Sequence, residues 1–142
     1  MISFACAFPS IPAFSPRAAA ETVLVVEDEA MVCELAAEAL LDEGYRVLTA
    51  ADADAAEDIL ARERVDLLFT DIDLARNTNG LVLAHRARRH WPNLPVVYTS
   101  GGRGQLSQAD AVSHSIFVPK PYRLSHLVAL ANDILRPNPH HA

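Results

Sequence analysis

Side chains suited to phosphate chemistry follow several apolar runs in this sequence. An acidic triplet, residues 27–29, comes directly after TVLVV, and Asp71 comes directly after DLLFT. Ser100 follows PVVYT, and Lys120 follows the run SIFVP. A carboxylate nucleophile, a bound metal ion and a lysine cation together suit phosphoryl transfer, in which catalysis consists mainly of positioning and charge neutralisation.

The expected group of carboxylates needs a counter-charge, because clustered carboxylates repel one another and one would otherwise take up a proton. Mg²⁺ prefers oxygen ligands and is commonly held by one or two carboxylates together with phosphate oxygens. Ser100 would supply a hydroxyl that can donate to a phosphoryl oxygen. Lys120 would supply a mobile positive charge for phosphate. It is the single lysine of the chain beside eleven arginines, which favours a specific role for it.

The segments that must position these residues alternate between strand-like and helix-like patterns, which predicts an α/β fold with a parallel sheet and helices on both faces. Strands are expected over Thr22–Val26, Arg46–Ala50, Asp66–Thr70, Pro95–Thr99 and Ser115–Val118, and helices over Ala30–Glu43, Ala53–Glu63, Gly80–His90 and Leu124–Leu135, with a weak helix within Gln105–His114. Such doubly wound sheets bind ligands outside the carboxyl ends of the strands. The reactive residues should therefore meet in one crevice.

Length and composition predict one globular domain over residues 21–136, between a flexible extension over residues 1–20 and a disordered tail over residues 137–142. Three prolines interrupt the apolar start, which argues against a signal peptide. The two cysteines show no metal-ligand spacing, and no apolar run approaches the roughly 20 residues of a membrane span. A cytoplasmic protein is expected. A net charge of −6 argues against a broad nucleic-acid surface, and the basic stretch 85–90 is interpreted as a solvated helix face.

Four motifs resemble, in their order and spacing, the receiver domain of two-component response regulators. They are VLVVEDE, LLFTDIDL, PVVYTSG and FVPKPY, and the resemblance covers the chain from about Thr22 to Leu135. It implies a flavodoxin-like, doubly wound five-stranded parallel sheet with strand order 2-1-3-4-5 and five helices. It also implies an Mg²⁺-dependent reaction in which a histidine kinase or a histidine phosphotransfer protein donates a phosphoryl group to Asp71.

The resemblance further implies how the metal would be held. Asp28 and Asp71 would bind Mg²⁺ directly, and Glu27 would act through a water molecule. The main-chain carbonyl of Asp73 would be a further ligand. The loop after the acceptor, IDLARNTNG, departs from the family pattern because it lacks the usual proline and is one residue longer.

The remaining implied roles concern signalling. Ser100 would be the switch hydroxyl, Lys120 would contact the phosphoryl group, and Phe117 would be the aromatic residue that turns inward on activation. Simple packing of Phe117 in the core is an alternative, and the two roles can coexist. The Lys120–Pro121 peptide bond would be cis.

Three interpretations of function remain open. The first is a stand-alone receiver, expected because about seven residues follow Leu135. It would be a monomer or weak homodimer that catalyses only its own phosphorylation and dephosphorylation. It would signal through contact with an unknown protein, without binding nucleic acid or membrane. The second is a degenerate receiver that serves as a scaffold without phosphorylation. The third is a phosphatase, because Asp71-Ile72-Asp73 mimics the DxD motif of haloacid-dehalogenase-type enzymes.

Overall fold

A five-stranded parallel sheet organises the chain, with strand order β2-β1-β3-β4-β5. The computed structural model describes residues 20–101 and 110–137. The elements are β1 (Thr22–Val26), α1 (Ala30–Asp42), β2 (Arg46–Ala50), α2 (Ala53–Arg62), β3 (Leu67–Asp71), α3 (Gly80–His90), β4 (Val96–Ser100), β5 (Ser115–Pro119) and α4 (Leu124–Leu135). The predicted fold class and strand order are confirmed, with four helices in the described part. Residues 105–109, the first half of the segment expected to hold a weak helix, lie outside the described residues, as do most of the N-terminal extension and most of the C-terminal tail.

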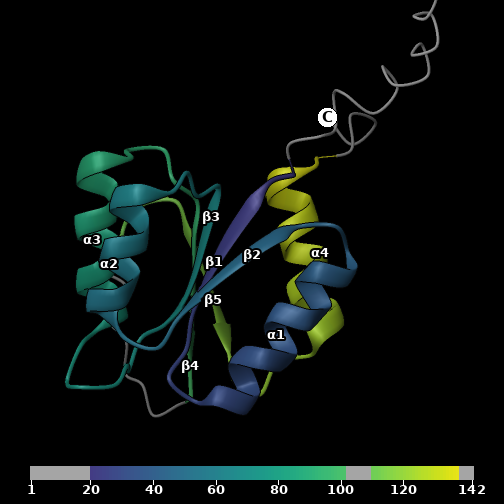
Figure 1. The fold of residues 1–142 in the computed structure, drawn as a ribbon, viewed down its shortest axis with the longest axis horizontal. Coiled ribbons are helices and arrows are strands. Elements are labelled where there is room, and N and C mark those ends of the chain that lie inside the picture. Colours follow the sequence, from purple (N-terminus) through teal and green to yellow (C-terminus); the bar gives the residue numbers. More distant parts are fainter. Residues whose placement is uncertain (1–19, 102–109, 138–142) are drawn as a thin grey trace, which may run out of the picture.

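Two layers of helices enclose the sheet (Figure 1). Helices α2 and α3 cover one face, and α1 and α4 cover the other. Along β1, Leu24 and Val26 pack toward α2 and α3, whereas Val23 and Val25 pack toward α1 and α4. Strands β1, β3 and β4 are buried at every residue, which explains why their sequences are nearly continuous apolar runs.

Strand β5 lies at the edge of the sheet and is much less buried. Of its five residues only Val118 is buried, while Ile116 and Phe117 are 39% and 44% exposed. The alternative that Phe117 packs in the core is therefore wrong. An edge strand has a neighbour on one side only, so an apolar run at an edge need not be enclosed as it is in the centre of a sheet.

Residues at the helix ends have the conformations and hydrogen bonds that the sequence predicts. Gly44 follows α1 with a φ of 99°, a left-handed conformation that glycine adopts without steric cost. The side chain of Asp52 caps α2 by accepting a hydrogen bond of 2.8 Å from the N–H of Ala55. The four helices and five strands of the described residues match the predicted bounds to within one residue. Among the described residues, no helix has the length and apolar character needed to cross a membrane.

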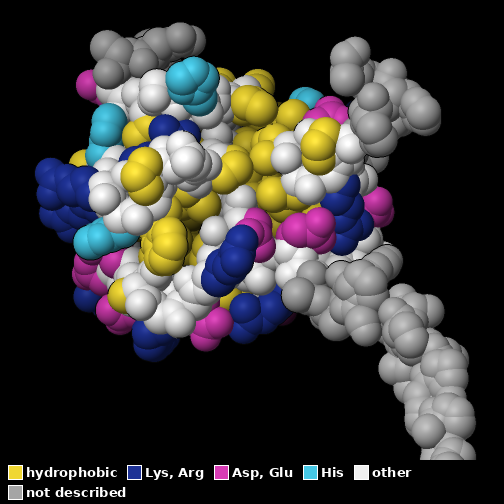
Figure 2. All heavy atoms as spheres, turned by 90° about the horizontal axis from the view of Figure 1, so that it is seen from above, with side chains coloured by type: hydrophobic (Ala, Val, Ile, Leu, Met, Phe, Trp, Pro, Cys, Tyr) yellow, Lys and Arg dark blue, Asp and Glu magenta, His cyan; other side chains and the backbone are white. Residues whose placement is uncertain are grey.

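The basic stretch 85–90 holds α3 to its neighbours rather than forming a separate positive patch. Arg86 makes a 3.0 Å ion pair with Glu57 of α2, and Nε of Arg88 donates to the carbonyl of Leu94 at 2.7 Å. On the face shown in Figure 2, basic and acidic side chains are interspersed around a central group of hydrophobic side chains.

Candidate functional site

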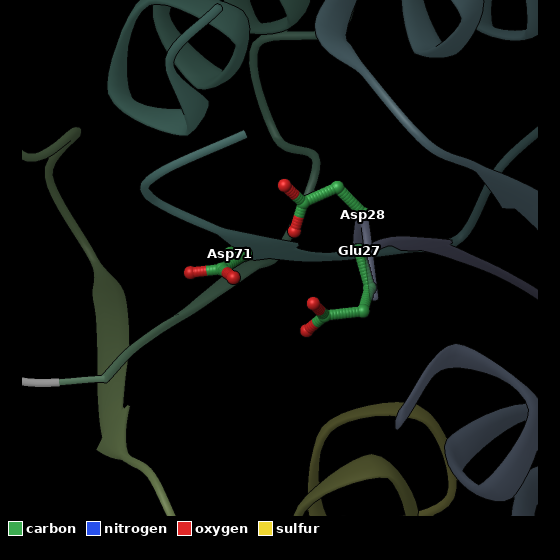
Figure 3. Close-up of side chains that lie close together, drawn as sticks. All are labelled: Glu27, Asp28 and Asp71. Carbon is green, nitrogen blue, oxygen red and sulfur yellow. The ribbon is translucent and has the colours of Figure 1, made fainter. Parts of the chain in front are cut away.

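Three carboxylates from two neighbouring strands meet at the carboxyl ends of β1 and β3. Glu27 and Asp28 directly follow β1, and Asp71 is the last residue of β3. One oxygen from each of the three lies within 4.8 Å of the others, and Figure 3 shows the side chains turned toward a shared space. Glu27 and Asp71 are buried, whereas Asp28 is exposed. The cluster is therefore open to solvent on the side of Asp28.

Lys120 lies against the two buried carboxylates. Its Nζ is 2.8 Å from Oε1 of Glu27 and 3.0 Å from Oδ2 of Asp71, and its side chain is 17% exposed. Oε1 of Glu29 is farther away, at 4.0 Å. The backbone N–H of Lys120 donates to the carbonyl of Ser100 at 2.9 Å, which fixes the end of β5 beside the end of β4. The sheet thus brings an amine from the end of β5 to acids on β1 and β3.

Burial dominates the electrostatics of this cluster. Loss of water raises the pKa of Glu27 and of Asp71, and the hydrogen bonds from Lys120 only partly offset this effect. Burial alone would lower the pKa of Lys120, but its hydrogen bonds to the two carboxylates outweigh burial and raise that pKa. One ammonium group therefore faces two buried carboxylates, and the cluster has an excess of negative charge.

This excess makes the donor set suitable for a divalent cation. The three gathered carboxylates offer only oxygen atoms, the ligands that Mg²⁺ prefers, and exposed Asp28 leaves room for water and phosphate oxygens. The backbone of Asp73 lies two residues beyond the end of β3, opposite Asn79 in a short antiparallel bridge. The residues present fit a magnesium site of the kind that keeps several water ligands.

The two expected switch residues occupy different environments. Ser100 is buried at the end of β4, and the register places its neighbour Thr99 beside Asp71. Phe117 lies on the exposed surface of β5, three residues before Lys120. The Lys120–Pro121 peptide bond is cis.

Comparison with known proteins identifies the family. The model of the response regulator receiver domain matches residues 23–132 of this chain. The chain belongs to the receiver domain family. Receiver domains are signalling domains that take phosphoryl groups from histidine kinases and bind Mg²⁺ through acidic residues, and this one carries the acidic cluster of Glu27, Asp28 and Asp71.

Several known regulatory proteins contain a region similar to this receiver domain. The nitrogen assimilation regulatory protein NtrX of Azorhizobium caulinodans is 35% identical over 119 residues, which cover 82% of this chain and 26% of that protein. The probable transcriptional regulatory protein TcrX of Mycobacterium tuberculosis is 32% identical, with coverages of 81% and 50%. The chain thus spans between about a quarter and a half of the length of these relatives.

Solved receiver structures share the fold. A response regulator receiver protein from Sinorhizobium medicae superposes with a TM-score of 0.77 at 29% identity, covering 82% of this chain and 94% of that one. The receiver domain of NtrX from Brucella abortus superposes with a TM-score of 0.69 at 34% identity, with coverages of 82% and 99%.

Sequence reasoning about this receiver missed the role of Gly80, the first residue of α3. A Cβ atom at this position would lie 2.1 Å from the main-chain oxygen of Asp71 and 2.9 Å from Oγ1 of Thr70. The N–H of Gly80 also donates to the carbonyl of Ile72 at 2.8 Å. Only glycine allows α3 to begin this close to β3. An isolated glycine at the first position of a predicted helix was the available signal.

Proposed function

We propose that this receiver domain accepts a phosphoryl group on Asp71 and signals through phosphorylation-dependent contact with another protein. The observation that carries the proposal is the meeting of Asp71 with two further carboxylates and the single lysine of the chain within one solvent-accessible cluster. A histidine kinase or histidine phosphotransfer protein would be the donor. This receiver domain would be located in the cytoplasm, because such donors carry their phosphohistidine there.

The transfer is a displacement at phosphorus. A carboxylate oxygen of Asp71 forms the new P–O bond while the P–N bond to the donor histidine breaks, and the imidazole leaves with the electron pair of that bond. Lys120 moves its positive charge from the Asp71 carboxylate to the phosphoryl oxygens, and the Ser100 hydroxyl donates a hydrogen bond to one of them.

Magnesium completes this site in the proposal. Asp28, Asp71 and the main-chain carbonyl of Asp73 would be direct ligands, and Glu27 would act through a bound water. The ion would neutralise negative charge on the transferring group. Glu27 also holds Lys120 near the acceptor through the 2.8 Å ion pair, so the amine remains in place when the phosphoryl group arrives.

The signal would leave the site through β4 and β5. A phosphoryl group on Asp71 adds negative charge and acceptor oxygens, which would draw in Ser100 and Lys120. These two residues are coupled by the hydrogen bond from the Lys120 N–H to the Ser100 carbonyl. Phe117, exposed in the unmodified protein, would turn inward and so change the surface of β5 that a target protein contacts.

An apolar hollow beside the site would receive the donor protein. It has a volume of about 430 Å³ and lies next to Lys120, with Val32 and Leu35 of α1 along one side. Leu35 is 47% exposed and Met31, also on α1, is 71% exposed. Exposed apolar side chains next to a reactive group suit contact with an apolar surface of a partner protein.

Labelling with acetyl phosphate tests the proposal. Wild type should take up one phosphoryl group, labile to both acid and base as an acyl phosphate is, in Mg²⁺ and none in EDTA, and Asp71→Asn should remain unlabelled. Asp73→Asn is a matched control, since its exposed side chain loses its charge while its main-chain carbonyl is kept. Unlabelled wild type would instead support the scaffold interpretation, and repeated turnover of a phosphomonoester would support the phosphatase interpretation.

A further inference from the structure

Thr78 ties the loop after the acceptor strand to the beginning of α2. Its Oγ1 accepts a hydrogen bond of 3.1 Å from the N–H of Ala53, the first residue of α2. The same hydroxyl donates to the carbonyl of Ala75 at 2.8 Å. The first N–H groups of a helix have no partner within the helix, so this side chain from a distant loop satisfies one of them.

The loop itself is a tight turn closed around Thr78. Its backbone N–H donates to the carbonyl of Ala75 at 3.1 Å, and its carbonyl accepts from the N–H of Leu74 at 3.2 Å. Arg76 and Asn77, at the tip, have φ values of 62° and 56°. Left-handed conformations cost non-glycine residues roughly 1 kcal/mol each, so cross-ties are needed to hold the turn. An ion pair of Arg76 with Asp52 adds little, because it is long, at 3.7 Å, and Arg76 is 70% exposed.

The junction between β2 and α2 makes hydrogen bonds both to the segment that follows β1 and to the loop between β3 and α3. The N–H of Glu27 donates to the carbonyl of Ala50 at 3.0 Å, three residues before Ala53. Thr78 fixes the β3–α3 loop to Ala53. The backbone that presents Glu27 and Asp28 and the loop that presents Asp73 are therefore held relative to one another through residues 50–53.

We propose that Thr78 is a positioning residue for the magnesium site, because it fixes the main chain of Asp73 relative to the carboxylates at the end of β1. This inference rests on the proposed function, in which the Asp73 carbonyl is a metal ligand. Loss of the hydroxyl releases the loop from α2 while leaving every carboxylate in the chain. The metal then has to order the loop when it binds, so its affinity falls.

Thr78→Val tests this role, because valine keeps the shape of threonine and removes its hydroxyl. Thr78→Ser restores the hydroxyl, and Thr49→Val makes the same change at an exposed position of β2. Two quantities are measured on the full chain: the Mg²⁺ dissociation constant from calorimetric titration, and the Mg²⁺ concentration that gives half-maximal labelling by acetyl phosphate. A net hydrogen-bond contribution of roughly 0.5–1.5 kcal/mol corresponds to a loss of affinity of about 2–10-fold.

The expected result is a 2–10-fold rise in both quantities for Thr78→Val, with unchanged labelling at saturating Mg²⁺ and wild-type behaviour for Thr78→Ser and Thr49→Val. Wild-type Mg²⁺ affinity in Thr78→Val would overturn the inference and leave the proposed function intact. The same weakening in Thr78→Ser as in Thr78→Val would also overturn it. If Thr78→Val does not fold, Thr78→Ala replaces it in the same comparison. A wild-type chain that binds no Mg²⁺ would overturn the proposed function itself.

Discussion

Replacing Lys120 with methionine tests how the acidic cluster is balanced. The variant keeps a side chain of similar length but leaves Glu27 and Asp71, whose side chains are 3% and 7% exposed, without their cation. Removing one partner from a buried ion pair costs about 3–5 kcal/mol. Part of this loss is relieved, because without Lys120 the pKa values of both carboxylates rise further and one of them can take up a proton. We therefore expect the unfolding free energy at pH 7 in EDTA to fall by about 3 kcal/mol.

Urea denaturation followed by circular dichroism measures this loss, and thermal unfolding should show a fall in Tm of about 10 °C for a domain of this size. Mg²⁺ should restore part of the stability by supplying the missing positive charge. Asp71→Asn should raise the unfolding free energy of the metal-free protein, because it leaves one ammonium group facing one carboxylate. Arg64→Met is a control at an exposed ion pair and should change stability little. A Lys120→Met variant within about 1 kcal/mol of wild type in EDTA would refute the reasoning.

Three further predictions concern the stability of the fold and its dependence on pH. Gly80→Ala should lower the unfolding free energy by about 3 kcal/mol in urea denaturation, because its methyl group would overlap the Asp71 carbonyl; a change below about 1 kcal/mol would contradict the 2.1 Å approach. Tyr45→Phe should cost about 1 kcal/mol in the same assay, because it removes the 2.5 Å hydrogen bond to Asn132 of α4; an equally stable variant would show that this contact contributes nothing. The raised pKa of Lys120 predicts that its stabilisation is fully present below pH 10.5, its ordinary pKa, and is lost as the pH rises through the higher folded value. The difference in stability between wild type and Lys120→Met should therefore shrink only above that pH, and a difference that already vanishes at pH 9 would contradict the assignment.

The sheet and the acidic cluster could be predicted from the sequence because both depend on local patterns. Buried parallel strands require nearly continuous apolar runs, and the carboxyl ends of such strands meet at one edge. Asp28, Asp71 and Lys120 were therefore placed together before any contact was known. Asp66, predicted to begin β3, instead uses its side chain to accept a hydrogen bond from the N–H of Thr22, and the strand begins one residue later.

Contacts between distant segments could not be predicted in the same way. The exposure of Phe117 depends on the position of β5 at the sheet edge, which an apolar run does not reveal. The left-handed conformations of Arg76 and Asn77 arise because the loop is tied to α2, and arginine has no intrinsic preference for them. The proposed role of Thr78 depends on its hydrogen bond with the N–H of Ala53, and no pattern in the neighbouring sequence predicts that contact.

The central claim is that Asp71 carries the phosphoryl group, and locating the modification tests it most directly. Wild-type protein is treated with acetyl phosphate and Mg²⁺, the acyl phosphate is reduced with borohydride, and the modified residue is identified by peptide mass spectrometry. The account predicts that residue 71, and no other carboxylate of the cluster, is reduced to homoserine. Reduction at Glu27 or Asp28, or stable phosphate on a serine or histidine with residue 71 unchanged, would contradict it.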